Sequence, residues 1–290
     1  MIDPSLIDEF VRQAGSPDEN LAAPALLMAR VAYPHLDPSP YLHELEQMGA
    51  TARAHVELGV GGQPSRRQRL RVISEFMFGQ LGFIGNREHY DDPRNSFLND
   101  VLARRTGIPI TLAVVFIEVA RRAGLAVEGV NFPGHFLLRC PVEPGTGDNA
   151  PLLLDPFHGG ALLHEAECTR LLRTHLGEEA LLEPGMLRAA GKHDILMRML
   201  LNLKRALARL RSFSQAHAVA ELLVALDPSS LTELRDRGLL ASQIGAHAAA
   251  LRDLEQWLRL SPGETEDDRA ERRQVWDHVK ELRRRMATLN

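Results

Sequence analysis

An apolar stretch bounded by Gly107 and Gly124 constrains the fold more than any other feature of this sequence. Residues 110–123 between these glycines are apolar nearly all round, and their number fits one helix of roughly four turns. A helix without a polar face has to be buried on every side. The stretch therefore predicts a central helix that the rest of the chain covers.

Three short apolar segments follow this helix and predict a small antiparallel sheet. They span residues 126–132, 135–140 and 151–155, and Pro-Gly and Glu-Pro-Gly-Thr-Gly-Asp-Asn separate them. Such dipeptides and polar clusters are typical of tight turns and hairpin loops. Strand alternation would place His135, Leu137 and Arg139 on one face and Cys140 on the other. Cys140 is therefore not expected to serve His135.

The His135 and Asp155 segments come after the helix, in the order helix, His strand, Asp strand. This order resembles a transglutaminase-like or papain-like core, in which a cysteine at the helix N-terminus attacks, histidine is the base and aspartate orients it. Proline suits the first helical turn because its missing N–H would be unpaired there. Pro109 holds the cysteine position, so His135 and Asp155 are interpreted as the remnant of a degenerate triad.

Three motifs make the resemblance more specific. They are Ser96-Phe-Leu-Asn-Asp-Val-Leu-Ala-Arg-Arg-Thr-Gly-Ile-Pro-Ile-Thr-Leu112, Gly129-Val-Asn-Phe-Pro-Gly-His-Phe-Leu137 and Leu154-Asp-Pro-Phe-His-Gly-Gly160. Together they are similar to the bacterial SirB family, an invasion-regulator-type group with a transglutaminase-like core and a tetratricopeptide tail. The resemblance covers most of residues 40–260. The resemblance implies this fold. It also implies that proline usually occupies the cysteine position, in a family whose biochemical activity is not established.

Polar residues within and beside these motifs are the candidate ligand-binding groups. They are Ser96, Asn99, Thr111 and Asn131. Ser96 and Thr111 are also substitute nucleophiles to weigh, but both have simpler interpretations. Asn95 or Ser96 is expected to cap the following helix through its side-chain oxygen, and Thr111 is expected to be a capping or packing hydroxyl.

A metal site is a chemical alternative in this region. His135, Asp155, His158 and His164 carry imidazole and carboxylate groups within a short span, and three such ligands plus water would satisfy zinc. Their spacing matches no compact ligand motif. We therefore expect neither a metal nor a cofactor.

Composition narrows the classes of protein. The chain of 290 residues has a formal net charge of −4, so it has no overall basic field for nucleic acid. No apolar run is long enough to span a bilayer, and the N-terminus lacks the pattern of a secretion signal. Cys140 and Cys168 are too few for a disulfide framework and are expected to be reduced thiols. A cytoplasmic protein without membrane partners is expected, and nucleic acid is an unfavoured partner.

A repeat appears after residue 191, where the pattern becomes helical without strands. Pro228 and Pro262 lie 34 residues apart, and Ala216 and Ala250 keep the same offset. That period is typical of tetratricopeptide repeats. The final charged helix, from Glu264 to Met286, is expected to cap the stack.

These patterns predict a mostly helical α+β protein with two domains. Residues 1–190 form a helical N-terminal region and a transglutaminase-like core with a small antiparallel sheet, and residues 191–290 form the all-α repeat segment. The substitution at Pro109 favours a non-catalytic, cytoplasmic interaction or regulatory protein. Its repeats would bind a protein partner, and its core would take a peptide or small anionic ligand. The alternative is a cysteine-protease-like hydrolase or acyl transferase that uses a displaced nucleophile with His135 and Asp155.

Overall fold

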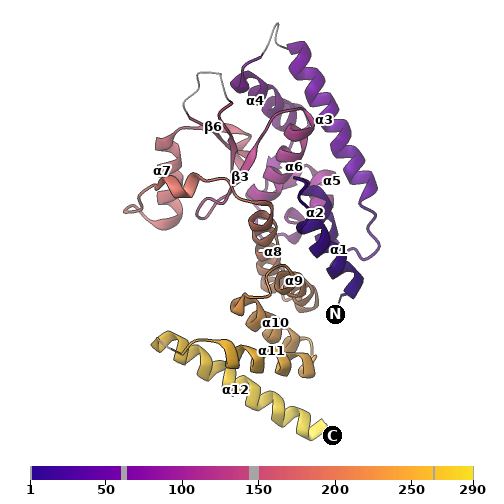
Figure 1. The fold of residues 1–290 in the computed structure, drawn as a ribbon, viewed down its shortest axis with the longest axis vertical. Coiled ribbons are helices and arrows are strands. Elements are labelled where there is room, and N and C mark those ends of the chain that lie inside the picture. Colours follow the sequence, from indigo (N-terminus) through magenta and orange to yellow (C-terminus); the bar gives the residue numbers. More distant parts are fainter. Residues whose placement is uncertain (1, 60–63, 144–149, 264, 290) are drawn as a thin grey trace. The chain divides into compact units, whose positions relative to one another are not determined.

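The computed structural model describes residues 2–59, 64–143, 150–263 and 265–289 (Figure 1). The chain divides into two compact units. The core unit comprises Gln13–Met199, and the repeat unit comprises Leu200–Asn290 together with Met1–Arg12. The predicted boundary after residue 190 stays a prediction. Within the described ranges, no helix combines the length and the apolar character needed to cross a membrane.

The core unit is built of helices around a small sheet. Its helices are α2 (Ala22–Ala29), α3 (Ser39–Gly59), α4 (Arg66–Ser74), the π-helix η1 (Glu75–Gln80), the 3-10 helix η2 (Pro93–Asn95), α5 (Leu98–Arg104), α6 (Pro109–Arg122), the 3-10 helix η3 (Pro156–His158), α7 (Glu165–Leu176) and the 3-10 helix η4 (Pro184–Leu187). Helix α1 (Pro4–Ala14) and helix α8 (Lys192–Arg209) each run across the boundary between the units.

Helix α6 is the centre of the core unit, as the apolar stretch predicts. Every residue from Pro109 to Ala120 is buried. Helices α2, α3, α4 and α5 pack against it, and so do β3 (Glu128–Val130), β4 (Leu137–Cys140) and η3 (Figure 1). Phe116 is fully buried and stacks on Phe78 of the π-helix, with ring centroids 5.9 Å apart. The helix is therefore enclosed between the sheet and the other helices.

The sheet has the order β3-β4-β5-β6, with β5 at Leu152–Asp155 and β6 at Ala161–Leu163, and every pairing is antiparallel. The antiparallel sheet is confirmed, and β6 is an additional strand that was not predicted. A second, parallel pair joins β1 (Ile84–Gly85) to β2 (Thr106–Gly107). His135 lies in the turn before β4 rather than within the strand, because its N–H donates to the carbonyl of Phe132 at 3.0 Å. The strand-alternation argument for its orientation therefore does not apply.

A buried carboxylate joins α6 to the start of α2. Glu118 has no exposed surface. Its Oε1 accepts from the backbone N–H groups of Leu21 at 2.6 Å and Ala22 at 3.2 Å, and its Oε2 accepts from Arg121 and Arg122. Free N–H groups at a helix start need acceptors. Glu118 supplies them from almost a hundred residues away in the sequence.

The repeat unit is a stack of antiparallel helices. After the end of α8 it contains α9 (Phe213–Leu226), α10 (Leu231–Gln243), α11 (His247–Leu260) and α12 (Glu266–Leu289). Ala216 on α9 and Ala250 on α11 are both fully buried at equivalent positions, as the 34-residue period predicts. Helix α12 packs on α11 through Val275, Val279 and Leu282, which agrees with its predicted capping role.

Polar groups inside the repeat unit are paired between its helices. Lys204 on α8 donates to Glu233 and to Asp236 on α10, and Arg237 on α10 makes two hydrogen bonds with Asp253 on α11, which is 2% exposed. The Arg237–Asp253 pair links consecutive helices, and the Lys204 pairs link helices two places apart in the stack. Solenoid repeats are held by such nearest-neighbour interfaces.

Candidate functional site

The N-terminus of α6 is closed by internal hydrogen bonds. The Thr111 hydroxyl donates to the backbone carbonyl of Asn95 at 2.7 Å and accepts from the N–H of Ile108 at 3.1 Å. Pro109, at the first helical position, and Ile110 are buried. Thr111 therefore behaves as the capping hydroxyl that was expected, and its oxygen is occupied by backbone partners.

His135 and Asp155 are brought together, as the order of the motifs predicts. The Nε2 atom of His135 lies 2.9 Å from Oδ1 of Asp155, and the two side chains are 6% and 4% exposed. Among the described residues, Nδ1 of the His135 ring has no hydrogen-bond partner. The Nε2 atom of His135 is thus held by the Asp155 carboxylate, and its Nδ1 atom contacts no hydroxyl or thiol of the described residues.

The sequence Asp155-Pro-Phe-His-Gly-Gly160 explains the geometry around the carboxylate. Asp155 ends β5 and caps η3, because its Oδ1 accepts from the N–H groups of Phe157 at 2.9 Å and His158 at 3.3 Å. Proline fits the first position of η3, where no N–H is required. Gly159 and Gly160 follow with positive φ, a conformation that glycine adopts without strain. The turn that follows Asp155 therefore fixes its side chain through the N–H groups of Phe157 and His158.

Two further histidines surround the pair. Nδ1 of His158 lies 2.7 Å from Oδ2 of Asp155, while its side chain is 42% exposed. His175 on α7 stacks on His135, with ring centroids 6.1 Å apart and an interplanar angle of 18°. This stacking needs a glycine at position 134, since a Cβ atom there would lie 2.4 Å from the His175 ring. His175 belongs to no motif, so sequence reasoning missed it.

The charges of the cluster follow from its hydrogen bonds. Burial alone would raise the pKa of Asp155, but hydrogen bonds from His135 and His158 outweigh it, so the pKa lies below the ordinary aspartate value. The pKa of His175 is lowered by burial and by the neighbouring His135. Asp155 is therefore an anion that two imidazoles face.

The two cysteines are buried and poorly suited to nucleophilic attack. Burial raises the pKa of both the Cys140 thiol and the Cys168 thiol to about 11. Because the thiolate is the reacting form, such thiols are inert at neutral pH. Neither sulfur is hydrogen-bonded to His135 among the residues that the structure describes.

Among the described residues, no hydrogen bond joins the remaining predicted ligand-binding residues Ser96, Asn99 and Asn131 to one another. Ser96 and Asn99 are buried, and Asn131 is exposed. The buried Oδ1 of Asn99 has no hydrogen-bond partner among the described residues. The predicted cap is wrong: Phe97 occupies the N-cap of α5 without a side-chain bond, and the Asn95 amide donates to the His89 carbonyl at 2.7 Å instead. The role of Ser96, Asn99 and Asn131 in ligand binding stays a prediction.

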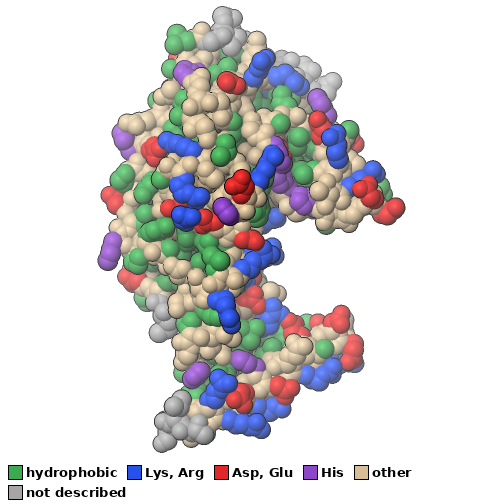
Figure 2. Space-filling model, turned by 180° about the vertical axis from the view of Figure 1, so that it is seen from behind, with side chains coloured by type: hydrophobic (Ala, Val, Ile, Leu, Met, Phe, Trp, Pro, Cys, Tyr) green, Lys and Arg blue, Asp and Glu red, His purple; other side chains and the backbone are tan. Residues whose placement is uncertain are grey.

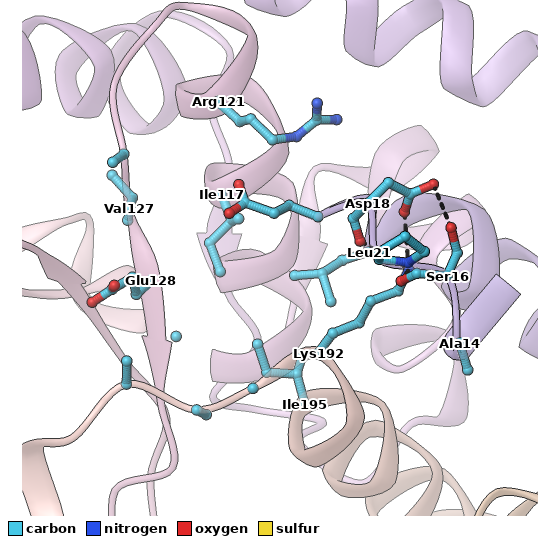
Figure 3. Close-up of a pocket in the computed structure, with 17 residues that line it drawn as sticks. Ala14, Ser16, Asp18, Leu21, Ile117, Arg121, Val127, Glu128, Lys192 and Ile195 are labelled. Carbon is cyan, nitrogen blue, oxygen red and sulfur yellow. Dashed lines mark hydrogen bonds and ion pairs between the residues drawn. The ribbon is translucent and has the colours of Figure 1, made fainter.

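A cavity of about 400 Å³ lies elsewhere in the core unit (Figure 3). Leu21, Ile117, Val127 and Ile195 give it an apolar lining, and Lys192 extends toward Asp18. The Lys192 ammonium donates to the Asp18 carboxylate at 3.0 Å and to the carbonyls of Ser16 and Asp18. The positive charge of Lys192 is thus already paired with the Asp18 carboxylate. The lining includes none of the residues of the histidine cluster.

Two family models match successive parts of the chain. A transglutaminase-like superfamily model matches residues 39–201, and a tetratricopeptide-repeat model matches residues 203–283. The first match contains the histidine cluster, and the second coincides with the helical stack.

Several proteins are similar to this chain. The UPF0162 protein of Xylella fastidiosa strain Temecula1 is 39% identical over 267 residues, which cover 90% of this chain and 92% of that protein. The UPF0162 protein of Vibrio cholerae is 29% identical, covering 72% and 75% respectively. Mouse F-box only protein 21 is 41% identical over 112 residues, which are 38% of this chain and 18% of that protein. Among solved structures, menin covers 95% of this chain at 10% identity and a TM-score of 0.39, a likeness too weak to support an argument.

Proposed function

Because this chain belongs to the transglutaminase-like superfamily and continues into tetratricopeptide repeats, we propose that it is a non-catalytic interaction protein. The core acts as a degenerate, ligand-binding form of the fold, and the repeat unit binds a protein partner. The cytoplasm is its proposed compartment. Assignment to the SirB family remains part of this proposal.

One observation carries the non-catalytic part of the proposal. The free ring nitrogen of His135 has no hydroxyl or thiol partner among the described residues, and Pro109 stands where the resemblance places the nucleophile. A general base has to reach the proton that it abstracts, directly or through one water. Without a neighbouring nucleophile, the His135–Asp155 pair has no acyl-transfer step to perform.

The binding part rests on the repeat unit. Tetratricopeptide repeats generally mediate protein–protein interaction, and a hollow of about 530 Å³ opens between α11 and α12. Trp276 lines it with Leu258 and Arg273, and the Trp276 side chain is 44% exposed. Tryptophan and arginine are enriched among residues that dominate binding energy. We place the partner over this hollow.

Charge also favours a protein partner over nucleic acid. On the face shown in Figure 2, acidic and basic side chains are interspersed over the C-terminal helices. Charged side chains of the repeat unit also pair with each other, such as Arg283 with Glu255 at 2.7 Å. A nucleic-acid surface needs a continuous basic patch. The mixed surface lacks that character on the visible face.

The test is quantitative affinity capture with the full chain and point variants. Trp276→Ala should lower the yield of specific partners at least about fivefold, since hot-spot truncation commonly costs more than 1 kcal/mol. Leu58→Ala is the matched control, because Leu58 is an exposed apolar side chain of the core unit. Undiminished capture by Trp276→Ala would place partner binding elsewhere.

Covalent labelling of a second set of variants tests the enzyme alternative. Broad serine- and cysteine-directed covalent probes should label the native protein no faster than a Cys140→Ala, Cys168→Ala double variant. Labelling of a hydroxyl or thiol that disappears in His135→Ala would contradict the proposal and support a displaced nucleophile.

A further inference from the structure

We propose that His135, Asp155 and His158 bind one zinc ion. This inference concerns the histidine cluster and does not depend on partner binding by the repeats. The ligand atoms of the three residues, one from each, all lie within 4.8 Å of one another. Two imidazoles and one carboxylate are a donor set that zinc commonly uses, with water or another ligand in the fourth position.

The arrangement of the donors supports a cation rather than a simple pair. His135 Nε2 faces one oxygen of Asp155 at 2.9 Å, and His158 Nδ1 faces the other oxygen at 2.7 Å. Orientation of His135 needs only the first of these contacts. The second imidazole adds a nitrogen donor that the orientation of His135 does not need.

The distances have to change by up to about 1.4 Å to fit a bound metal. Ligand atoms on tetrahedral zinc lie about 3.4 Å apart when the bonds are roughly 2.0–2.1 Å long. The two N–O distances of 2.9 and 2.7 Å therefore need to widen by about 0.5–0.7 Å, and ligand atoms that lie up to 4.8 Å apart need to approach. Because the His158 side chain is 42% exposed, it can make much of this movement by rotation.

The tautomer of each imidazole matters for binding. A neutral imidazole exposes a lone pair toward a metal once its N–H is on the other ring nitrogen. Zinc binding therefore requires that Nε2 of His135 and Nδ1 of His158, the nitrogens that face Asp155, carry no proton.

The surroundings hold the ligands in place and leave one side open. Backbone N–H groups of Phe157 and His158 bind the Asp155 carboxylate, and such outer contacts orient metal ligands. His175 covers one face of the His135 ring. The exposed edge of His158 provides the entry path for the ion. Nitrogen donors disfavour magnesium and calcium, which prefer oxygen.

The experiment is calorimetric titration of the tag-free, chelator-treated full chain with Zn²⁺. The expected result is a single site per chain, together with visible absorption of four-coordinate Co²⁺ when cobalt replaces zinc. His158→Ala should weaken zinc binding at least about tenfold, the lower end of losses seen even for outer-shell contacts. Because the His158 side chain is exposed, the variant should keep its fold, and circular dichroism checks that it does.

His164→Ala is the matched control, because His164 is an exposed histidine close in sequence whose side chain is not part of the cluster. It should bind zinc like the unmodified protein, and Mg²⁺ should give no binding heat to either. Zinc should also raise the Tm of the unmodified protein but not that of His158→Ala. Absence of binding, undiminished binding by His158→Ala, or equal loss in His164→Ala would each overturn the proposal.

Discussion

The two units of the molecule stabilise their buried polar groups in different ways. In the core unit the Glu118 carboxylate accepts from Leu21 and Ala22, which lie 97 and 96 residues away in the sequence. In the repeat unit Lys204 pairs with Glu233 and Arg237 pairs with Asp253, 29 and 16 residues away, so these pairs join helices one or two places apart in the stack. The stability of the core therefore depends on segments far apart in the chain, whereas that of the stack depends on nearby helices.

This difference explains where chemistry can be concentrated. Long-range contacts bring a turn, a strand end and α7 to one place, so the core unit assembles several histidines around one carboxylate. A stack of repeats spreads its contacts along an extended surface, which suits binding to a protein. The core is the place to look for a bound ion, and the repeats are the place to look for a partner.

Removal of a buried carboxylate should show the long-range dependence most strongly. Glu118→Ala leaves Arg122 and two backbone N–H groups without their buried acceptor, so the free energy of unfolding should fall by about 3–5 kcal/mol. Urea denaturation of the full chain measures it. Glu46→Ala is the control, since Glu46 also pairs with Arg122 at 2.9 Å but its side chain is 69% exposed. Its cost should stay below about 1 kcal/mol, and equal losses would contradict the comparison.

A second variant addresses the histidine cluster. Asp155→Asn keeps the size of the side chain but removes its charge, and should lower the free energy of unfolding by about 1–3 kcal/mol. Because the pKa of Asp155 is lowered in the folded protein, its contribution is present above about pH 4, the ordinary aspartate range, and is lost as pH falls through the folded value.

Urea denaturation at several pH values measures this contribution. The gap in stability between the unmodified protein and Asp155→Asn should therefore narrow from pH 6 toward pH 3. A gap that is independent of pH would show that the charge of Asp155 does not stabilise the cluster.

The smallest expected effect is local and lies in the repeat unit. A Cβ atom at Gly238 would lie 2.8 Å from the Leu254 side chain on the adjacent helix, so Gly238→Ala should cost about 1–2 kcal/mol through overpacking. Hydrogen exchange should quicken mainly in α10 and α11. Gly185→Ala, where a Cβ meets nothing within 4 Å, serves as the control. Faster exchange throughout the core unit would mean that the repeats are not held by nearest neighbours alone.

Features that repeat or run continuously were the ones that the sequence predicted well. The apolar character of α6, the 34-residue period and the three strands all leave a local pattern. The meeting of His135 with Asp155 was predictable because their motifs resemble a known order of elements. The fourth strand, Ala161–Leu163, was missed because three residues carry no alternation to recognise.

Contacts set by tertiary packing left no such pattern. Glu118 is one charged residue in an apolar helix, and nothing in the sequence marks Leu21 and Ala22 as its partners. His175 meets His135 only because α7 folds back over Gly134. Asn95 was expected to cap a helix, but its amide bonds the preceding loop at His89. For Glu118 and His175 a contact with residues far away in the sequence decided the role of the side chain, and for Asn95 the fold of the preceding loop did.

The buried guanidinium of Arg66 bears on how this protein could be engineered. It donates to the carbonyls of Cys140 and Pro141 on one side and of Ala150 on the other, at 3.0, 2.6 and 3.0 Å. One side chain thus clamps both ends of the connection between β4 and β5. Engineering of this part of the core unit should therefore leave Arg66 unchanged, since removal of its side chain would take one shared donor from three carbonyls.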